Sequence, residues 1–392
     1  MPSFLRKTIF LGSFYARTSR PISINPGFLQ NPDFFPLRLF SASSNQETFT
    51  VSYLINSIGL SPQIALLASK HVNFEAPEKP DKVIKVFKDY GFTRPQISSL
   101  VKSYPPVLLS NTEKTILPKL EFLKSKGLSG PEMAKRLSVY PTLLKCSLDK
   151  QIIPSFDFFR DFFRSDKKAS VAVKRFPDIL VNDVEKIVVP NMNILREYGV
   201  SDSNIAKLLV NQPKAFMISS DKLRKIVEKV KEMGFDASKF KFLLAVLSFR
   251  AMSTSTWERK VSAYRGCGWS EEDVFSAFHR FPWCMMLSEE NIIASVNFFV
   301  YELGWRPCLI AKRPIILSMS LEKRVIPRWS VFQALLSKGL VKEEVSLYAL
   351  LETPEEKFLL KFITPYKKEA PELLKLYREK LKLSNKPPVE KA

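Results

Sequence analysis

A proline followed by short apolar residues and then Ser or Asn recurs along the chain, and it restricts the possible folds more than any other feature. The first three intervals are equal, since 141 − 105, 177 − 141 and 213 − 177 are all 36. The next, 282 − 213 = 69, spans two units, with Arg250 expected in place of the missing proline, and the last is 314 − 282 = 32. The anchor prolines are Pro105, Pro141, Pro177, Pro213, Pro282 and Pro314. A fixed period of about 20–50 residues predicts a solenoid of stacked repeats.

Glycines form a second marker in phase with the prolines. A glycine just past a helix end supplies the left-handed residue that terminates the helix. Phe163 stands where one such glycine is due. The marker glycines are Gly91, Gly127, Gly199, Gly234, Gly268, Gly304 and Gly339. The two markers together predict units of two helices, joined at the glycine and closed at the proline.

Helix-start signals support this division. Ser110 is expected to cap the first helix of one unit, with Glu113 completing a capping box. The same spacing occurs in the pairs Ser129/Glu132, Thr93/Gln96 and Ser270/Asp273, the last with Asp in the Glu role. One helix pair cannot bury its own apolar face, so the pairs must stack. The predicted fold is therefore an all-α helical-repeat solenoid, right- or left-handed.

Several units hold a further proline inside the first helix. Two of the intervals again equal 36, since 154 − 118 and 190 − 154 give that value. These residues are Pro118, Pro154, Pro190 and Pro327. A proline inside a helix removes one hydrogen bond and kinks the helix. A kink repeated at one position predicts a curved stack.

The charge points to a polyanionic partner. The chain has 392 residues with 60 Lys and Arg against 39 Asp and Glu, a formal net charge of +21. Such an excess favours nucleic acid or an anionic membrane surface as the partner. No apolar run is long enough to predict a membrane span.

The sequence contains no sign of catalysis or of a cofactor. It lacks a phosphate-binding loop, a dinucleotide fingerprint, a nucleophile elbow and a zinc-protease motif. The four cysteines show no C-x-x-C pair and the chain has two histidines, so no metal is expected. The interpretation is a non-enzymatic protein without cofactor whose thiols are free and partly buried in a reducing compartment.

The N-terminus differs from the rest of the chain. Residues 1–45 are basic and rich in Ser, with Asp33 as the single acid, which is typical of an organellar transit peptide. Arg38-Leu39-Phe40-Ser41 resembles a mitochondrial processing site, so mitochondria are favoured over chloroplasts; a disordered basic tail is the alternative. Residues 46–90 are predicted to be N-terminal capping helices, 91–345 the repeat array, and 346–392 a C-terminal capping helix with a basic tail, or alternatively a nucleic-acid-binding arm.

Basic residues gather near the anchors, and residues in one phase of a solenoid line one edge. The predicted nucleic-acid-binding residues are Lys102, Arg136, Lys174, Arg175, Lys207, Lys214, Arg280, Lys312 and Arg313; Lys145 also follows an anchor. Such a stripe would neutralise phosphates along a nucleic acid. Cations near helix C-termini also complement the helix dipole, which is the alternative for each single residue. The aromatic cluster from Phe156 to Phe163 is interpreted as core rather than as a base-stacking platform.

The sequence resembles the mitochondrial transcription termination factor (mTERF) family, in its large plant branch. The resemblance covers roughly residues 50–345 and rests on the repeated P-x-[IL]-L turn with its following Ser. It is strengthened by the phrases LPKLEFLKSKGLS (117–129), RFPDIL (175–180), IPRWSVF (326–332) and LLSKGL (335–340). Tetratricopeptide, ankyrin and pentatricopeptide repeats lack this turn.

The resemblance implies a left-handed superhelix of triple-helical motifs whose third helix is short. It further implies a basic concave face that holds double-stranded DNA, with arginines in the major groove. Family members regulate organellar transcription, often its termination, and several plant members act on RNA, including group II intron splicing. No local motif carries the family's DNA-contacting arginines over to individual positions here.

Three hypotheses follow. The first is an organellar regulator that binds double-stranded DNA to control transcription, by termination or a related step. The second is an RNA-binding factor for group II intron splicing or RNA processing, which needs the same basic groove. The third is a helical-repeat scaffold that binds proteins, including organellar transcription or splicing proteins. A monomer is expected in each case.

Overall fold

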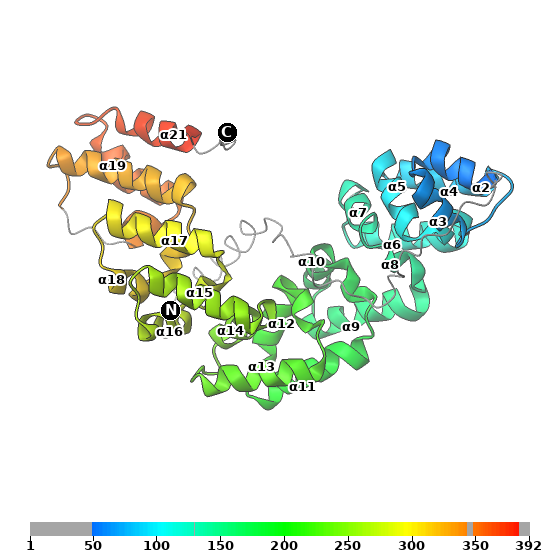
Figure 1. The fold of residues 1–392 in the computed structure, drawn as a ribbon, viewed down its shortest axis with the longest axis horizontal. Coiled ribbons are helices and arrows are strands. Elements are labelled where there is room, and N and C mark those ends of the chain that lie inside the picture. Colours follow the sequence, from blue (N-terminus) through cyan, green and yellow to red (C-terminus); the bar gives the residue numbers. More distant parts are fainter. Residues whose placement is uncertain (1–48, 129, 343–347, 384–392) are drawn as a thin grey trace. The chain divides into compact units, whose positions relative to one another are not determined.

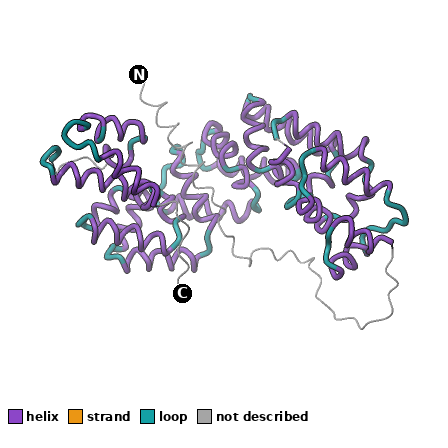
Figure 2. Tube along the Cα trace, turned by 90° about the horizontal axis from the view of Figure 1, so that it is seen from above, coloured by secondary structure: helices purple, strands orange, loops and turns teal. Residues whose placement is uncertain are grey.

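The computed structural model describes residues 49–128, 130–342 and 348–383. Every regular element in these ranges is helical, and they contain no β-strand (Figures 1 and 2). The chain divides into two compact units. Unit 1 comprises Met1–Asn193 with Ile205–Ser220, and unit 2 comprises Ile194–Asn204 with Asp221–Ala392. The predicted transit peptide lies outside the described residues.

The helices of unit 1, with η marking a 3₁₀ or π turn, are α2 (Phe49–Tyr53), η2 (Leu54–Ile58), α3 (Pro62–Ser69), α4 (Glu78–Asp89), α5 (Arg94–Ser103), η3 (Pro105–Leu109), η4 (Thr112–Ile116), α6 (Leu117–Ser125), α7 (Gly130–Leu137), α8 (Thr142–Lys145), η5 (Leu148–Ile152), α9 (Ile153–Phe163), α10 (Asp166–Arg175), η6 (Pro177–Leu180), η7 (Val184–Val188) and η8 (Pro213–Phe216). Helices α11 (Val189–Glu197) and α12 (Asp202–Asn211) contribute residues to both units.

Those of unit 2 are α13 (Ser220–Glu232), α14 (Phe240–Ala251), α15 (Thr254–Gly266), α16 (Glu271–Arg280), η9 (Pro282–Met286), α17 (Glu289–Asn297), η10 (Phe298–Glu302), α18 (Pro307–Lys312), η11 (Pro314–Ser318), η12 (Leu321–Val325), α19 (Ile326–Ser337), η13 (Tyr348–Glu352), α20 (Glu355–Phe362), η14 (Thr364–Tyr366) and α21 (Leu373–Leu383). In most repeats two helices precede one short turn, as in the three-helix motif that the resemblance implied.

Each anchor proline begins or directly precedes a short helical turn and is buried. Proline cannot donate the hydrogen bond that would continue the preceding helix, so the helix ends there and the chain reverses. Five of the turns are 3₁₀ helices, and the one after Pro141 is the short α8. The proline repeat therefore predicted the helix boundaries correctly.

The unit that lacks the anchor proline shows that this proline ends the second helix and starts the short turn. In that unit α14 runs unbroken from Phe240 to Ala251, and no short turn follows it. Ser253 caps the next helix. In other repeats the capping serine lies six residues after the anchor proline, as Ser288 does after Pro282 and Ser320 after Pro314. Since 253 − 6 = 247, Leu247 occupies the anchor position. The assignment of that place to Arg250 was wrong, because it relied on local similarity rather than on the cap.

All seven marker glycines adopt positive φ, as predicted. In the third unit the left-handed residue is Arg164, with φ of 49°, and Phe163 is a buried core residue of α9. The sequence placed the substitution one residue too early, because α9 extends one residue further than the 36-residue period indicates. An L-residue in this conformation costs about 1–2 kcal/mol.

The prolines inside the first helices follow π-helical turns. Turns η4, η5, η7 and η12 each end two residues before a proline, which is the second residue of the next α-helix. In η4 the bond from Ile116 N to Asn111 O, 3.2 Å long, spans five residues. A proline ring clashes with the carbonyl four residues earlier, and a π turn widens the backbone there. These helices therefore begin with a π turn, and the predicted kink and curvature of the stack stay predictions.

The capping predictions were partly correct. Two of the four predicted capping boxes are formed, Thr93 with Gln96 and Ser270 with Asp273. The cap of η4 is Asn111, whose side chain accepts from the backbone N of Lys114, rather than Ser110. Both residues suit a cap by type, and the length of the preceding 3₁₀ turn decides between them. Ser129 lies outside the described residues.

Polar side chains join several repeats to the next. Lys119 Nζ donates to Leu144 O at 2.6 Å, and Asn191 Nδ2 donates to Phe216 O at 2.9 Å and to Ile218 O at 2.8 Å. In unit 2, Lys260 Nζ donates to Met285 O at 2.7 Å. The first carbonyl is always three residues past the anchor, since 144 − 141, 216 − 213 and 285 − 282 all equal 3. We call these contacts the cross-repeat hydrogen bonds.

The left-handed position yields a first prediction. Arg164→Gly should raise the free energy of unfolding by about 0.5–1 kcal/mol, because glycine adopts positive φ without a steric penalty. Gly199→Ala is the matched opposite change, since a Cβ there would meet no atom within 4 Å, and it should lower the value by about 1 kcal/mol. Urea denaturation of the full chain measures both. A loss of stability in the Arg164 variant would contradict the assignment.

The cross-repeat hydrogen bonds yield a second prediction. Asn191→Leu keeps a similar volume but leaves two carbonyls without their donor, and should cost about 2–3 kcal/mol. Asn204 is the control, because its Nδ2 also donates to a carbonyl, Ser238 O at 3.1 Å, but at an exposed site. Asn204→Leu should cost less than about 0.5 kcal/mol. Equal shifts of the urea midpoint would show that burial of these carbonyls is unimportant.

Candidate nucleic-acid interface

The short turns of unit 1 lie side by side. Lys145 belongs to the second turn and Tyr104 directly precedes the first turn. The Lys145 Nζ atom is 4.9 Å from the centre of the Tyr104 ring. Helix α8 contacts η6, which joins the second turn to the third. Arg175 lies just before the third turn and Asn211 just before the fourth. The Nη1 of Arg175 donates to Oδ1 of Asn211 at 2.8 Å. We call the surface formed by the turns 105–109, 142–145, 177–180 and 213–216, with the last residues of the helices before them, the turn edge of unit 1.

The turn edge holds most of the predicted binding residues of unit 1. Lys102 and Arg175 are exposed in the last turns of α5 and α10, Arg136 is half-buried in the last turn of α7, and Lys214 is exposed in η8. Lys207 is half-buried in α12, one helical turn before Asn211. Cations that share a phase in four repeats thus lie at one edge, and Lys145 belongs with them because it follows its anchor as Lys214 does.

Lys174 does not join the other cations. Its side chain reaches back to the preceding repeat, where a Cβ placed on Gly127 would lie 2.7 Å from its Nζ. The residue is half-buried, in contrast to the exposed Arg175 beside it. Neighbouring positions on a helix point about 100° apart, so the sequence interval that grouped the two residues could not place both on one edge.

Unit 2 has a shorter edge of the same kind, where η9 and η11 contact each other. Arg280 and Lys312 are exposed at the ends of the helices before these turns. Arg313 instead pairs its Nε with Glu352 Oε1 at 2.9 Å, and the Glu352 side chain is 9% exposed. Arg313 therefore stabilises a nearly buried carboxylate as well as adding charge to the edge.

One carboxyl lies among the cations of unit 1. Burial raises the pKa of Asp178 above its ordinary value of 3.8, while the charges of Arg136 and Lys214 act in the opposite direction. These cations come from the preceding and the following repeat, so Asp178 brings three repeats together electrostatically. It also leaves less positive potential for a phosphate at this point of the edge.

A second cation lies beneath the edge. Lys119 is 5% exposed and bonds to the carbonyl of Leu144, and burial lowers the pKa of its ammonium. Burial likewise raises the pKa of the nearby thiol of Cys146, which Lys119 and Lys145 partly offset. Lys119 was not among the predicted site residues, and its burial makes it structural. All four cysteines are free, with Cys284 buried and the others half-buried.

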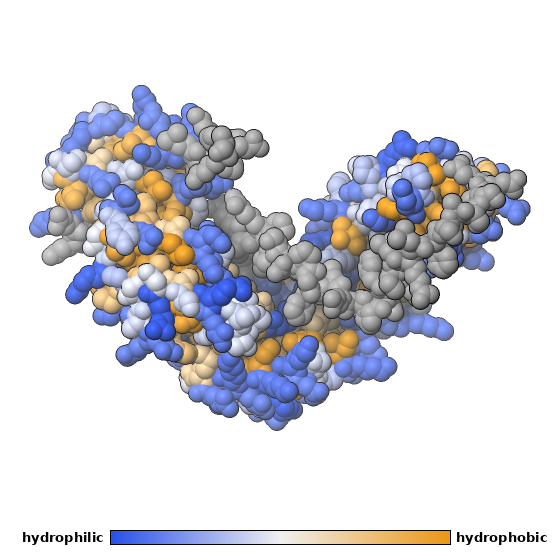
Figure 3. Space-filling model, viewed as in Figure 1, coloured by the Kyte–Doolittle hydropathy of each residue, from blue (hydrophilic) through white to orange (hydrophobic). Residues whose placement is uncertain are grey.

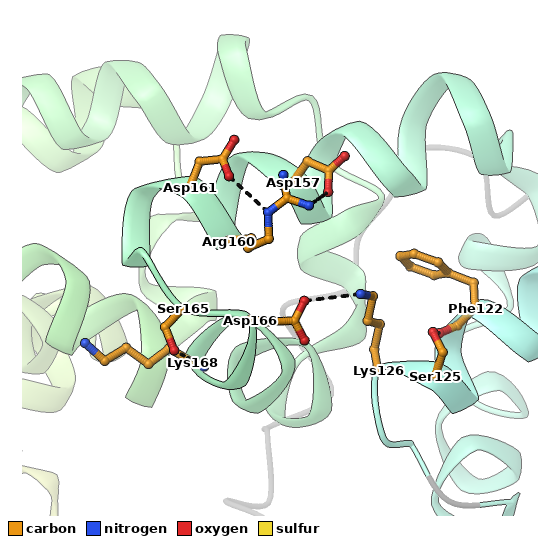
Figure 4. A network of polar contacts seen from close by, with 9 residues as sticks. All are labelled: Phe122, Ser125, Lys126, Asp157, Arg160, Asp161, Ser165, Asp166 and Lys168. Carbon is orange, nitrogen blue, oxygen red and sulfur yellow. Dashed lines mark hydrogen bonds and ion pairs between the residues drawn. The ribbon is translucent and has the colours of Figure 1, made fainter.

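The opposite ends of the same repeats have a different charge arrangement, drawn in Figure 4. There Arg160 lies between Asp157 and Asp161, at 2.6 and 3.0 Å. Lys126 Nζ reaches Asp166 Oδ1 at 3.2 Å, joining the glycine end of α6 to the start of α10. Acidic residues thus pair with Lys126 and Arg160 at this end of the repeats, where a helix N-terminus also favours them.

The predicted Phe cluster belongs to the core. Phe156, Phe159 and Phe163 are at most 4% exposed, and Phe158 and Phe162 are half-buried. Apolar side chains do gather at the surface of unit 2 over α15, α17 and α18 (Figure 3), and α17 and α18 carry the exposed Ile293 and Leu309. The protein-scaffold alternative would use that surface rather than the turn edge.

The described part of the chain offers neither a metal-binding cluster nor a membrane-spanning helix. Within ranges 49–128, 130–342 and 348–383, no group of three or more His, Cys, Asp or Glu residues is placed to hold a metal ion. In the same ranges, no helix has both the length and the apolar character that a membrane span requires.

The family model named mTERF matches residues 84–247 and 246–359, which is more than half of the chain. The chain belongs to the mTERF family. The two matched segments meet at residues 246–247, inside α14, where the anchor proline is absent. Proteins of this family are organellar helical-repeat proteins that bind nucleic acid and regulate gene expression, generally without catalysis. No curated protein matches the chain. Its place in the plant branch stays a prediction.

Asp178 yields a third prediction. The pKa of Asp178 is higher in the folded protein than in the unfolded chain, so its ionisation destabilises the fold. The destabilisation is absent when pH is below the pKa of the unfolded chain and complete when pH exceeds the pKa of the folded protein. Asp178→Asn should therefore melt at a higher temperature than the wild type at pH 7, and the difference should vanish near pH 3. Thermal unfolding from pH 3 to 7 measures it. A difference that grows toward low pH would have the wrong sign.

Proposed function

We propose that this protein regulates gene expression in mitochondria by binding nucleic acid along the turn edge. The observation that carries the proposal is the convergence of exposed cations from four consecutive repeats of unit 1 at one edge. A polyanion is the partner that such an edge fits, because phosphate contacts release counterions and so favour binding. The formal charge of +21 agrees with this partner.

Two targets suit the function. Double-stranded DNA would let the protein control transcription, by termination or a related step, with the phosphates of the duplex on the cations. Organellar RNA would make it a factor for group II intron splicing or RNA processing, and part-exposed aromatic side chains on the same edge favour this candidate. Phosphate contacts alone serve both targets equally, because they do not read sequence.

The location and the organisation of the chain are further parts of the proposal. The motif Arg38-Leu39-Phe40-Ser41 supports import into mitochondria rather than chloroplasts. We further propose a monomer in which residues 1–45 act as the transit peptide, with cleavage after Phe40, 46–90 and 346–392 cap the ends, and 91–345 form the array.

Charge reversal on the turn edge is the fourth prediction. Arg175→Glu with Lys145→Glu should weaken nucleic-acid binding strongly and lower the slope of log affinity against log salt by about one per cation. Both side chains are exposed, so the fold should be kept. Lys167→Glu with Lys168→Glu changes the net charge equally at the exposed start of α10, away from the turns. Equal losses in the two double variants would show that net charge alone, rather than this edge, drives binding.

The target is identified in the organelle. The tagged mature protein is crosslinked in isolated mitochondria, and the bound DNA and RNA are sequenced in parallel. A sharp DNA peak at a gene boundary would support transcription control, and peaks within introns or at transcript ends would support RNA maturation. Enrichment of neither nucleic acid would overturn the proposal and favour the protein-scaffold alternative.

A further inference from the structure

The residue just before each anchor proline is aromatic in three of the four turns of unit 1. These residues are Tyr104, Tyr140 and Phe176, and Gln212 follows in the fourth. Each of the four closes the helix before it with a backbone bond to the carbonyl four residues earlier. The backbone angles also repeat, with φ and ψ of −147° and 72° at Tyr104, −149° and 82° at Phe176, and −138° and 64° at Gln212.

The nearly equal backbone angles give the side chains of Tyr104, Phe176 and Gln212 equivalent directions from their repeats. Because consecutive turns of unit 1 lie side by side, the residues that directly precede their prolines, Tyr140 included, follow one another in a row along the turn edge. Phe281 repeats the conformation in unit 2, with φ of −148° and ψ of 84°. The conformation is thus a property of the repeat, and the aromatic residue at this position is a feature of this chain's sequence.

Folding alone does not explain why these positions carry aromatic side chains. Tyr140 is 50% exposed, and Tyr104 and Phe176 are half-buried. Gln212, which holds this position in the fourth turn with similar backbone angles, shows that the turn itself does not require a ring. Among the described residues, the rings of Tyr140 and Phe176 pack on no other ring or cation. The ring of Tyr104 already carries the ammonium of Lys145 at 4.9 Å.

Each of these rings has a cation close to it in sequence or in space. Arg136 lies one helical turn before Tyr140, Arg175 directly precedes Phe176, and Lys145 covers Tyr104. Aromatic faces interleaved with cations are the chemistry that binds single-stranded nucleic acid, with bases on the rings and phosphates on the cations. A duplex offers no free base faces, because its bases already stack on one another. Helical-repeat proteins that read RNA take one base per repeat.

We propose that the turn edge of unit 1 binds single-stranded nucleic acid, with Tyr140 and Phe176 stacking on unpaired bases. This inference rests on the proposed function and specifies its substrate class. Stacking tolerates any base, because every base has an aromatic face. The rings therefore supply affinity for unpaired strands over duplexes, and Gln212 is the position in the row where a side chain can form hydrogen bonds with a base edge.

The test is a binding titration of the full chain with a labelled single-stranded RNA, the single-stranded DNA of the same sequence, and the corresponding duplex DNA. Tyr140→Leu removes the flat ring and keeps apolar volume, and should weaken single-strand binding about fivefold to about a hundredfold, the range reported by alanine substitution of stacking aromatics. Tyr140→Trp should retain single-strand binding because indole is also a flat ring, and the stacked base should quench the indole fluorescence. Tyr301→Leu is the control, since this tyrosine is 78% exposed on η10, away from the turns.

The outcomes separate the two proposals. Tighter binding of single strands that Tyr140→Leu weakens, with Tyr301→Leu unchanged, supports the stacking row, and the RNA and DNA arms identify the strand. Two outcomes would overturn the stacking row and keep the proposed function. One is tighter binding of the duplex than of the single strands. The other is single-strand binding that Tyr140→Leu leaves unchanged but charge reversal at Arg175 and Lys145 abolishes. No binding to any of the three overturns both.

Discussion

Burial of the proline-led turns is the constraint on which the rest of the structure depends. Each turn packs its apolar side chains into the core, and its backbone carbonyls are buried with them. Buried carbonyls without donors cost about 1–3 kcal/mol each. The preceding repeat supplies the donor, from Lys119, Asn191 or Lys260 according to the repeat. At the C-terminal end Arg328, only 2% exposed, donates from Nη1 to Thr353 O at 2.8 Å. Neighbouring repeats are thus held by directed polar bonds as well as by apolar contact.

The same turns determine where charge can gather. A turn that closes the second helix leaves that helix's last residues at the surface, where cations are favoured by the helix dipole. Acidic residues lie in the first turns of helices at the glycine ends, as Asp166 does beside Lys126. One edge of each unit therefore becomes basic without any single charge being costly. The dipole and the phosphate explanations of these cations are compatible, because a cation that stabilises a helix end can also bind a phosphate.

Local signals predicted much of the fold because they act over short distances. The anchor prolines, the marker glycines and the boxes at Thr93 and Ser270 each fix a helix end through one or two residues. The errors arose where a repeat departs from the period. Arg164 takes the left-handed place because α9 is longer, Leu247 stands at the anchor because α14 is unbroken, and Asn111 caps in place of Ser110. Counting residues cannot detect a helix that extends by one.

The sequence by itself determined that this chain is a stack of helical repeats, that its excess charge is positive, and in which phase the cations recur, because period and composition are one-dimensional properties. Only the tertiary structure decided which cations share an edge. It turned Lys174 toward Gly127, buried Lys119 under a turn and paired Arg313 with Glu352. It also brought the positions of Tyr140 and Phe176 to the same edge as Lys145 and Arg175. Side-chain direction depends on packing against the neighbouring repeat, which no single unit of the sequence specifies.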